Sequence, residues 1–294
     1  MKYFTASAFR QALDDRLKAE SEHTGLALGR LRKRVAFELF LRRLVVVAPG
    51  RWVLKGALAL DFRFKATSRP TNDMDLGRAD DESAAIEDFT AAQELVLDDF
   101  FSFAVRRTDD LDDTDDFQAT RFHVTAELAG RVFDQFVVDV GFVDSISARP
   151  EEIETSDLLS FAGIEPLRVP ALPLPQHVAE KVHAYTRAYG ESGRASTRPK
   201  DLVDILLIAG IEPLNAGALR AALETTFSER NQQPLPATLP PPPEGWREPY
   251  ARLAADVAVA TNLESAHALA SEFIDPILAG SAADTWDPLC RVWR

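Results

Sequence analysis

The stretch Arg51-Trp-Val-Leu-Lys-Gly-Ala-Leu-Ala-Leu60, followed by Arg69-Pro-Thr-Asn-Asp-Met-Asp-Leu76, decides the fold that this sequence predicts. Its pattern is typical of a strand, a glycine turn, a short helix and a second strand that carries Asp73 and Asp75. Side chains two residues apart on a strand point to the same face of the sheet. Neighbouring carboxylates repel each other unless a cation lies between them, and Mg²⁺ prefers such ligands together with substrate phosphates. The stretch therefore predicts a metal-dependent phosphate site.

An Asp-x-Asp pair alone also has a plain structural interpretation, because any exposed strand can carry one. Here the pair has a chemical context: Lys55 and Gly56 precede it, and Arg69 and Thr71 lie beside it. A glycine lets the backbone approach a phosphate closely and exposes amide groups at the start of a helix. We therefore assign Lys55, Gly56, Arg69 and Thr71 to the phosphate-binding part of the site.

A third carboxylate stands alone in the apolar run Phe136-Val-Val-Asp-Val-Gly-Phe142. An unpaired carboxylate in such a run would be costly to bury, so Asp139 needs a cation, either an arginine or a metal ion. Two interpretations stay open. Asp139 forms a structural ion pair, or it is the third acid beside Asp73 and Asp75.

Length and composition limit the classes of protein to which the chain can belong. With 294 residues, 46% of them hydrophobic, it can bury one large core or two modest ones. A single cysteine, Cys290, excludes a disulfide framework and a cysteine-rich zinc site. The sequence has neither an apolar N-terminal signal region nor an apolar run of membrane-spanning length. We therefore expect a cytoplasmic protein without a membrane partner.

The charge of the chain is divided between its parts. The net charge of −13 argues against a nonspecific nucleic-acid coat protein. However, residues 1–65 contain 14 Lys/Arg against 6 Asp/Glu, whereas residues 71–165 contain 6 against 25. Such a chain can present a basic face to a polyanion and leave an acidic face for another partner.

Two N-terminal helices are predicted over residues 5–20 and 26–47, because apolar residues recur there at helical spacing. The polar side of the second carries a basic cluster: Arg30, Arg32, Lys33, Arg34, Arg42 and Arg43. One interpretation is a solvated helix face. The other is contact with RNA phosphates, which arginine and lysine recognise without reading sequence.

The remainder of the first half predicts a helix followed by a run of strands. The helix is expected over residues 83–100, and the strands over 101–107, 118–128 and 132–143. Six acids lie within residues 109–116, which we expect to be a solvated loop. This segment lacks the glycine turn and the closing glutamate of a calcium-binding EF-hand.

The proline-punctuated segment Leu167-Arg-Val-Pro-Ala-Leu-Pro-Leu-Pro175 predicts a domain boundary. We therefore expect a first domain over residues 1–166, including the N-terminal helices within 5–47, and a helical domain over 167–294. The expected helices of the second domain cover residues 176–189, 200–208, 215–230 and 247–279. The fold class is thus mixed α/β (α+β).

Three charged residues of the second domain are further candidates. Lys181 lies on its first helix, and Asp201 with Asp204 falls at one turn of the next. Their plain interpretations are a surface lysine and an acid that favours the first turn of a helix.

Taken together, these motifs resemble the AbiEii/AbiGii family of nucleotidyltransferase toxins, which includes the MenT-type toxins and belongs to the polymerase-β-like nucleotidyltransferase superfamily. The resemblance covers most of the chain. It rests on Phe9…Leu13…Arg16-Leu17, Arg42-Arg43-Leu44, Trp52-Val-Leu-Lys-Gly-Ala-Leu-Ala-Leu60, Arg69-Pro-Thr-Asn-Asp-Met-Asp-Leu76, Lys181 and Arg198-Pro-Lys-Asp-Leu-Val-Asp204. It implies a small mixed sheet flanked by helices, and a helical C-terminal domain that completes the active-site cleft.

The resemblance also implies roles for individual residues. Gly56 matches the phosphate-contacting glycine, and Asp73 with Asp75 matches the metal-binding pair. Asp139 fits the third acid of the superfamily. Lys181 matches a lysine that contacts nucleotide phosphates, and Asp201 best fits the Lys-Asp motif that follows, with Asp204 as its neighbour.

The activity implied is transfer of a nucleotide from an NTP to the 3′ acceptor end of tRNA, with Mg²⁺ or Mn²⁺ and release of pyrophosphate. Such a toxin blocks aminoacylation and is restrained by a cognate antitoxin. Thr71 matches a position that an antitoxin phosphorylates in MenT-type relatives. Two alternatives stay open: a transferase that modifies a protein or small molecule, and a catalytically silent nucleotide-binding regulator.

Overall fold

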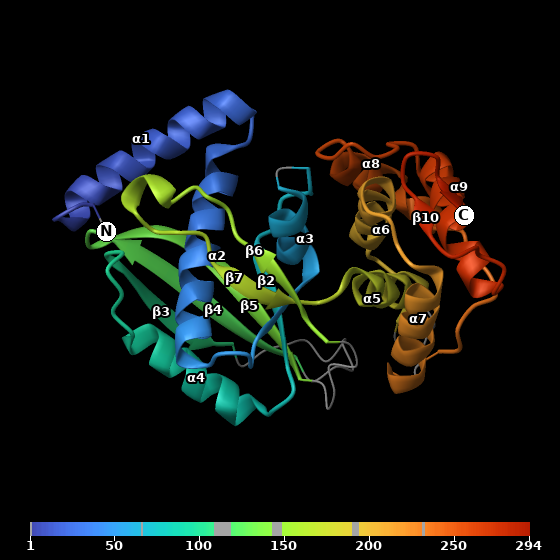
Figure 1. The fold of residues 1–294 in the computed structure, drawn as a ribbon, viewed down its shortest axis with the longest axis horizontal. Helices are drawn as coiled ribbons and strands as arrows, with labels where there is room; N and C mark the ends of the chain where they lie inside the picture. The colour runs from blue at the N-terminus through green and yellow to red at the C-terminus, as the bar shows by residue number, and fades with distance from the viewer. Residues whose placement is uncertain (1, 66, 109–118, 143–148, 190–193, 231–232) are drawn as a thin grey trace. The chain divides into compact units, whose positions relative to one another are not determined.

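The computed structural model describes residues 2–65, 67–108, 119–142, 149–189, 194–230 and 233–294 (Figure 1). The acid-rich segment 109–116 lies outside the described residues. The chain divides into two compact units. Unit 1 comprises Met1–Ala66, Pro70–Ile146 and Pro150–Ala171, and unit 2 comprises Thr67–Arg69, Ser147–Arg149 and Leu172–Arg294.

Among its described residues, unit 1 is built on a seven-stranded mixed sheet in the order β3-β4-β5-β2-β1-β7-β6. The strands are β1 (Val53–Lys55), β2 (Asp73–Arg78), β3 (Phe101–Arg107), β4 (Ala119–Leu128), β5 (Arg131–Phe142), β6 (Glu151–Glu154) and β7 (Arg168–Ala171). The helices are α1 (Ala6–Thr24), α2 (Leu28–Val47), α3 (Gly56–Phe64) and α4 (Glu82–Glu94), with a 3₁₀ turn, η1 (Ser160–Ala162).

The predicted order of strand, glycine turn, helix and strand is confirmed in β1, α3 and β2. β2 pairs antiparallel with β1 and parallel with β5. The predicted strands over 101–107, 118–128 and 132–143 appear as β3, β4 and β5. β2 and β5 meet in the middle of the sheet, where burial of both strands fixes their register.

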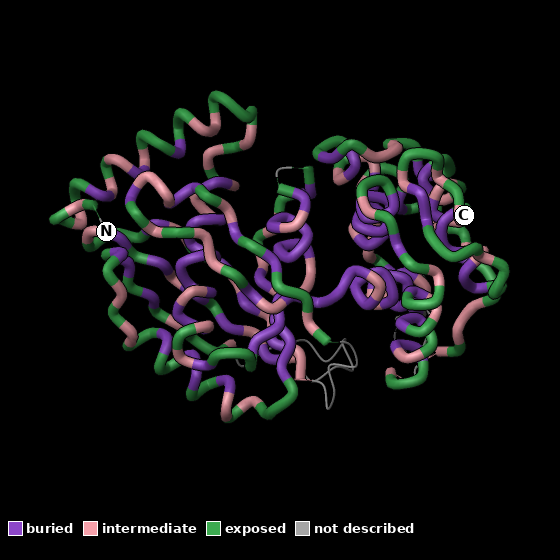
Figure 2. Tube along the Cα trace, in the orientation of Figure 1, coloured by how far each residue is buried: buried purple, intermediate pink, exposed green. Residues whose placement is uncertain are grey.

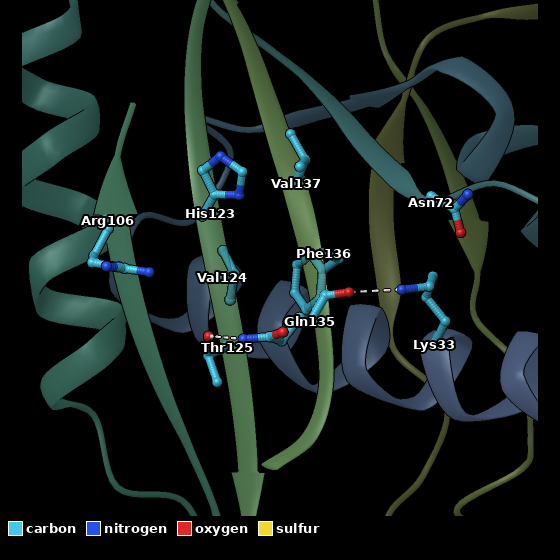
Figure 3. A pocket seen from close by; sticks show the side chains of 9 residues that line it. All are labelled: Lys33, Asn72, Arg106, His123, Val124, Thr125, Gln135, Phe136 and Val137. Carbon is cyan, nitrogen blue, oxygen red and sulfur yellow. Dashed lines mark hydrogen bonds between the residues drawn. The ribbon is translucent and has the colours of Figure 1, made fainter. Parts of the chain in front are cut away.

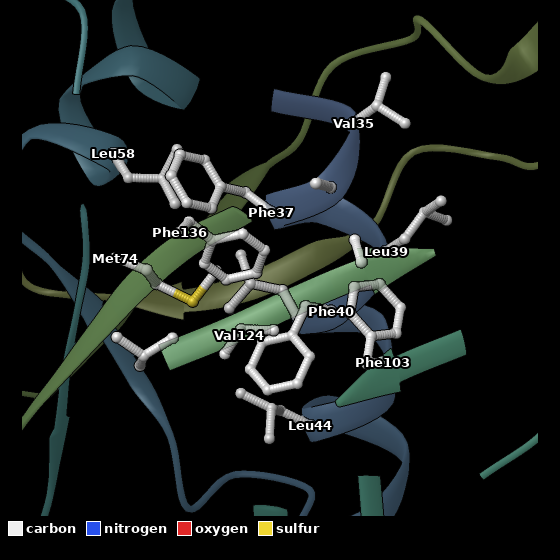
Figure 4. Close-up of a cluster of buried hydrophobic side chains, with 14 of the residues drawn as sticks. Val35, Phe37, Leu39, Phe40, Leu44, Leu58, Met74, Phe103, Val124 and Phe136 are labelled. Carbon is white, nitrogen blue, oxygen red and sulfur yellow. The ribbon is translucent and has the colours of Figure 1, made fainter. Parts of the chain in front are cut away.

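One face of β3, β4 and β5 is covered by α1, α2 and α4 (Figure 1). Alternate strand residues point into this layer and are buried, whereas their neighbours in sequence are half-buried or exposed (Figure 2). The core between the layers is aromatic: the ring of Phe37 lies 4.8 Å from that of Phe136 (Figure 4). The ring of Phe40 also stacks on that of Phe89. Dense packing of this kind makes the sheet a rigid platform for the site.

The basic cluster of α2 is paired with carboxylates of unit 1. The partners are Asp61 for Arg30 and Arg34, Asp14 for Arg32, Asp134 for Lys33, Glu38 for Arg42 and Asp99 for Arg43. Arg34 and Arg43 are buried. The cluster therefore has a third use besides the two expected from sequence, because most of these pairs fasten α2 to neighbouring elements of unit 1.

Unit 2 is largely helical. Its helices are α5 (Leu174–Thr186), α6 (Pro199–Ile211), α7 (Ala216–Arg230), α8 (Arg247–Ala254) and α9 (Leu263–Leu278), with a 3₁₀ turn, η2 (Glu244–Trp246). Two short hairpins join β8 (Ala188–Tyr189) to β9 (Arg194–Ala195) and β10 (Trp286–Asp287) to β11 (Val292–Trp293). α5 packs against α6 and α7, and α6 packs against α8 and α9.

The predicted mixed α/β fold, with a central mixed sheet flanked by helices, is confirmed. Two details differ from the sequence prediction. The helix expected over 83–100 ends at Glu94, and the segment after residue 150 contributes two further strands, β7 beside β1 and β6 at the edge of the sheet. None of the described helices combines the length and apolarity that a membrane span requires.

Candidate active site

The three candidate acids of unit 1 lie on adjacent strands. Asp73 and Asp75 alternate with the buried Met74, so both project from the same face of β2. Asp75 is in register with Asp139 on β5 and with Lys55 on β1. The row Lys55, Asp75, Asp139 therefore crosses three strands, and Asp73 lies two residues along β2 from it.

Gly56 meets this row at the first residue of α3. Its φ of +62° is in the left-handed region, which favours glycine. A Cβ atom on Gly56 would lie 1.7 Å from Oδ2 of Asp75. The helix start and the carboxylate are thus so close that only a residue without a side chain fits between them.

Thr71 lies against the first acid of the pair. Its hydroxyl donates a 2.7 Å hydrogen bond to Oδ1 of Asp73. Thr71 is half-buried, as is Asp73. A hydroxyl in this position fixes the rotamer of the carboxylate, and any group added to its oxygen would lie beside Asp73.

Asp139 has an arginine partner. Nε and Nη2 of Arg121, on β4, each donate a 2.8 Å hydrogen bond to one oxygen of Asp139. This bond raises the pKa of Arg121, and the charges of Asp73 and Asp75 act in the same direction. Arg121 therefore lies in the electrostatic field of all three acids. Of the two interpretations of Asp139, the contacts in the structure match the ion pair with an arginine.

These contacts bear on how well the acids suit a metal ion. The donors are all carboxylate oxygens, the ligands that Mg²⁺ and Mn²⁺ prefer, and Asp73 and Asp75 project side by side. Within the part of the chain that the structure describes, no group of three His, Cys, Asp or Glu side chains is arranged to hold a metal. Asp73 and Asp75 thus have the ligand chemistry that such an ion needs, and metal binding by Asp73, Asp75 and Asp139 stays a prediction.

Unit 2 contains a separate charged cluster around Lys181. Its ammonium lies 2.7 Å from Oδ2 of Asp204 and 3.1 Å from Oδ1 of Asp201. Arg69 binds both oxygens of Asp204, at 2.8 and 3.0 Å, and Arg198 binds Asp201 at 2.8 Å.

Burial sets the electrostatics of this cluster. Asp201 and Asp204 are completely buried, and Lys181 and Arg69 are each 7% exposed. Burial alone would raise the pKa of Asp204, but Lys181 and then Arg69 outweigh it, so that this pKa lies below its ordinary value. Burial likewise opposes the charge of Lys181, yet Asp204 and Asp201 raise its pKa. Lys181 is therefore a fixed cation at neutral pH.

The structure groups the predicted residues into two sets. Lys55, Gly56, Thr71, Asp73, Asp75 and Asp139 belong to unit 1, whereas Arg69, Lys181, Asp201 and Asp204 belong to unit 2. Arg121 was not predicted as a member of the first set. Its signal in the sequence was the alternation of Arg121 and His123 with apolar residues, which indicates a polar strand face but no partner.

Comparisons with known proteins identify a family and a related fold. The family model described as nucleotidyl transferase AbiEii toxin of type IV toxin–antitoxin systems matches residues 39–275. The structure resembles MenT4, a nucleotidyltransferase toxin from Mycobacterium tuberculosis, with a TM-score of 0.57 and 18% identity over 89% of each chain.

Two Helicobacter pylori structures are more distant in fold. JHP933 has a TM-score of 0.45 and 13% identity over 84% of this chain and 92% of its own. A putative nucleotidyltransferase has a TM-score of 0.43 and 14% identity over 84% and 94%. The comparison with curated proteins gives no significant match.

Proposed function

The chain belongs to the AbiEii family of nucleotidyltransferase toxins of type IV toxin–antitoxin systems, and from this premise we propose that it transfers a nucleotide from an NTP to the 3′ end of tRNA. The family resemblance expected from the sequence is confirmed, as is the assignment to nucleotidyltransferases. The acceptor, the metal and the partners named below are our proposals.

One observation carries the proposal: Gly56, at the start of α3, is in close approach to the carboxylate of Asp75. Backbone amides at a helix start favour phosphate groups, and adjacent carboxylates favour a cation. Their juxtaposition suits a triphosphate whose charge is shared between amide groups and a metal ion. Lys55, beside Gly56 and in register with Asp75, adds a cation to the same row.

In the proposed reaction Asp73 and Asp75 would hold Mg²⁺ or Mn²⁺, which when bound neutralises phosphate charge and acidifies a hydroxyl. The 3′ oxygen of the acceptor forms a bond to the α-phosphorus of the NTP, and the bond from that phosphorus to pyrophosphate breaks. The proton of the acceptor hydroxyl passes to a carboxylate of the site, and Asp139 is the proposed third metal ligand. Thr71 orients Asp73 through its hydrogen bond.

For unit 2 we propose that Lys181 and Arg69 contact the phosphates of the nucleotide. Supporting this role, Lys181 stays charged at neutral pH, and Arg69 lies in the same buried cluster, where both bind Asp204. Asp204 holds both cations, and Asp201 holds Lys181 with Arg198. The sharing of one cleft by the two units stays a prediction.

The proposed partners follow from the family. A nucleotide added to the 3′ end of tRNA would block aminoacylation and stop translation, so that a cognate antitoxin is needed to restrain the toxin. NTPs and tRNA are cytoplasmic, and we propose that the protein acts there. Phosphorylation of Thr71 is the proposed means of restraint, because it would place about two negative charges beside Asp73.

The proposal is tested by incubating the protein with Mg²⁺, total tRNA and each labelled NTP in turn. Label is expected in the tRNA with the wild-type protein and not with Asp73→Ala. Label that entered protein instead would favour a protein-modifying transferase. No label in any acceptor would favour a nucleotide-binding regulator.

A further inference from the structure

The sheet face of β3, β4 and β5 that lies opposite α1, α2 and α4 is hollowed by a groove of about 470 Å³ (Figure 3). We call it the β-face groove. Its polar lining residues are Lys33, Asn72, Arg106, His123, Thr125 and Gln135. A volume of this size is within the range of small-ligand sites.

Strand register connects this groove directly to the metal-binding pair. Asp73 is in register with Val137 on β5, Val137 with His123 on β4, and His123 with Arg106 on β3. Neighbouring strands lie ~5 Å apart, so the backbone of this row runs for about 14 Å from Asp73 to Arg106. Arg106 and His123 are exposed, and no carboxylate among the described residues pairs with Arg106.

The floor of the groove is shaped by the end of β2. Because β2 begins at Asp73, opposite Val137, its pairing with β5 stops before Gln135. The ammonium of Lys33 donates a 2.7 Å hydrogen bond to the backbone carbonyl oxygen of Gln135, and the side-chain amide of Gln135 donates to the hydroxyl of Thr125 (Figure 3). The groove thus offers an amide and a hydroxyl group beside the row that joins Asp73 to Arg106.

Sheet order separates this groove from the phosphate-binding glycine. β1, which leads into Gly56, flanks β2 on one side, and β5, β4 and β3 follow on the other. In a phosphoryl transfer the attacking and leaving oxygens lie roughly in line, on opposite sides of the phosphorus. If the triphosphate lies at Gly56, the attacking hydroxyl must therefore approach from the opposite side, where the β-face groove lies.

We propose that the β-face groove binds the 3′-terminal nucleotides of the acceptor RNA, an inference that rests on the proposed nucleotidyl transfer. The charge along the row matches this occupant. The terminal ribose of an RNA carries neutral hydroxyls, which suit the end near Asp73, and its first phosphate lies further back, toward Arg106. His123 offers a ring for base stacking, and the polar groups offer hydrogen bonds to base and sugar.

The neighbouring Arg107 provides a matched control. It lies on the same strand as Arg106, it is also exposed, and it pairs with Glu82 of α4, which belongs to the opposite layer. Arg107→Ala therefore removes the same charge as Arg106→Ala without touching the β-face groove.

The test measures binding of a short RNA hairpin with a single-stranded 3′ end, and of a labelled NTP, to the full chain. Arg106→Ala combined with His123→Ala is expected to weaken RNA binding roughly tenfold and to reduce the slope of log K against log salt by about 0.7. NTP binding is expected to stay within twofold of the wild type, and Arg107→Ala to change neither. Photocrosslinking of a 3′-terminal 4-thiouridine is expected to label peptides of β4 or β5.

The outcomes separate this inference from the proposed function. Unchanged RNA binding in the double variant, or a crosslink confined to peptides without lining residues, overturns the groove assignment. NTP binding that weakens in place of RNA binding also overturns it and assigns the groove to the nucleotide. If RNA binds and crosslinks here but the wild type transfers no label to it, the groove assignment stands and the proposed activity fails.

Discussion

Gly56 and Asp75 approach each other so closely that a Cβ atom on the glycine would lie 1.7 Å from Oδ2 of the carboxylate. Because Gly56 has no side chain, the start of α3 can lie in contact with Asp75 on β2. This contact places the start of α3 directly beside the candidate metal-binding pair, and the first prediction concerns its loss.

Gly56→Ala is expected to lower nucleotidyl transfer at least a hundredfold, because the new methyl group must displace the carboxylate of Asp75. An alanine held at this φ of +62° also strains the backbone, which destabilises the folded state by about 1 kcal/mol. Labelled-nucleotide transfer and urea unfolding measure the two effects separately.

Gly50→Ala is the matched control, because Gly50 has a φ of +76° but no atom within 4 Å of the added Cβ. Gly50→Ala is expected to lower the free energy of unfolding by about as much as the backbone strain of Gly56→Ala does, and to retain nucleotidyl transfer. Equal activity losses in the two variants would mean that backbone strain, and not displacement of Asp75, causes the defect.

The pair of Arg121 and Asp139 gives a second prediction. Arg121→Gln is expected to tighten Mn²⁺ binding about tenfold, since it removes a positive charge from the field of three carboxylates. Isothermal titration calorimetry with Mn²⁺ alone measures this without any turnover. Arg131→Gln, at the far end of β5, is expected to leave the affinity unchanged.

Weaker Mn²⁺ binding in Arg121→Gln would contradict this account. It would mean that Arg121 holds Asp139 in place for the metal and does not compete with it.

These two relationships also mark what could be predicted from the sequence. The order of strand, glycine, helix and acid-bearing strand follows from local patterns, so β1, α3 and β2 were predictable with Asp73 and Asp75 in place. The partner of Asp139 was not predictable, because Arg121 is brought beside it by strand register and not by spacing.

The same limit applies to the basic cluster of α2. Helical spacing indicates which cations share a face, but their partners Asp14, Asp99 and Asp134 are distant in sequence. Strands β6 and β7 were missed because both are four residues long and β7 contains Pro170. Proline lacks the amide donor of a strand and argues against one.

The buried cluster of unit 2 predicts a large stability effect. Asp204→Asn is expected to lower the free energy of unfolding by about 3 kcal/mol or more, because Lys181 and Arg69 would share a buried site with one carboxylate fewer. Urea unfolding monitored by circular dichroism measures the loss. The exposed Asp256→Asn, in the same unit, is expected to change stability by under about 0.5 kcal/mol.

The pH dependence of this effect has a defined sign. The pKa of Asp204 is lowered in the native state, so its contribution is present above its ordinary pKa of about 4 and is lost as the pH falls through the native value. The gap in stability between wild type and Asp204→Asn should therefore narrow below about pH 4. A gap that widened on acidification would contradict the ion-pair assignment.

Glu38 predicts the opposite pH dependence. Burial raises the pKa of this α2 carboxyl to about 7, although Ser156 and Arg42 act against the shift. The native state then holds a proton that the unfolded state has lost, so stability falls as the pH rises from about 4.5 through 7. Relative to wild type, Glu38→Gln is expected to gain up to roughly 3 kcal/mol over this range.

Urea unfolding at several pH values checks this prediction. A constant difference between the two proteins from pH 5 to pH 8 would show that Glu38 titrates at its ordinary value.

The hydrogen bond from Thr71 to Asp73 predicts a graded response to substitution. Thr71→Val removes the bond and is expected to lower transfer by less than tenfold. Thr71→Glu adds a negative charge beside Asp73, as phosphorylation would, and is expected to lower transfer at least a hundredfold. Full activity of Thr71→Glu in the labelled-tRNA assay would exclude regulation through this residue.

The central claim is that the 3′-terminal hydroxyl of tRNA attacks an NTP held at Gly56, Asp73 and Asp75. It is tested most directly by comparing intact tRNA with tRNA whose terminal ribose has been opened by periodate, in the presence of Mg²⁺ and labelled NTP. The account predicts that label enters the intact tRNA alone, and only when Asp73 is present. Equal labelling of the oxidised tRNA, or labelling by Asp73→Ala, would contradict it.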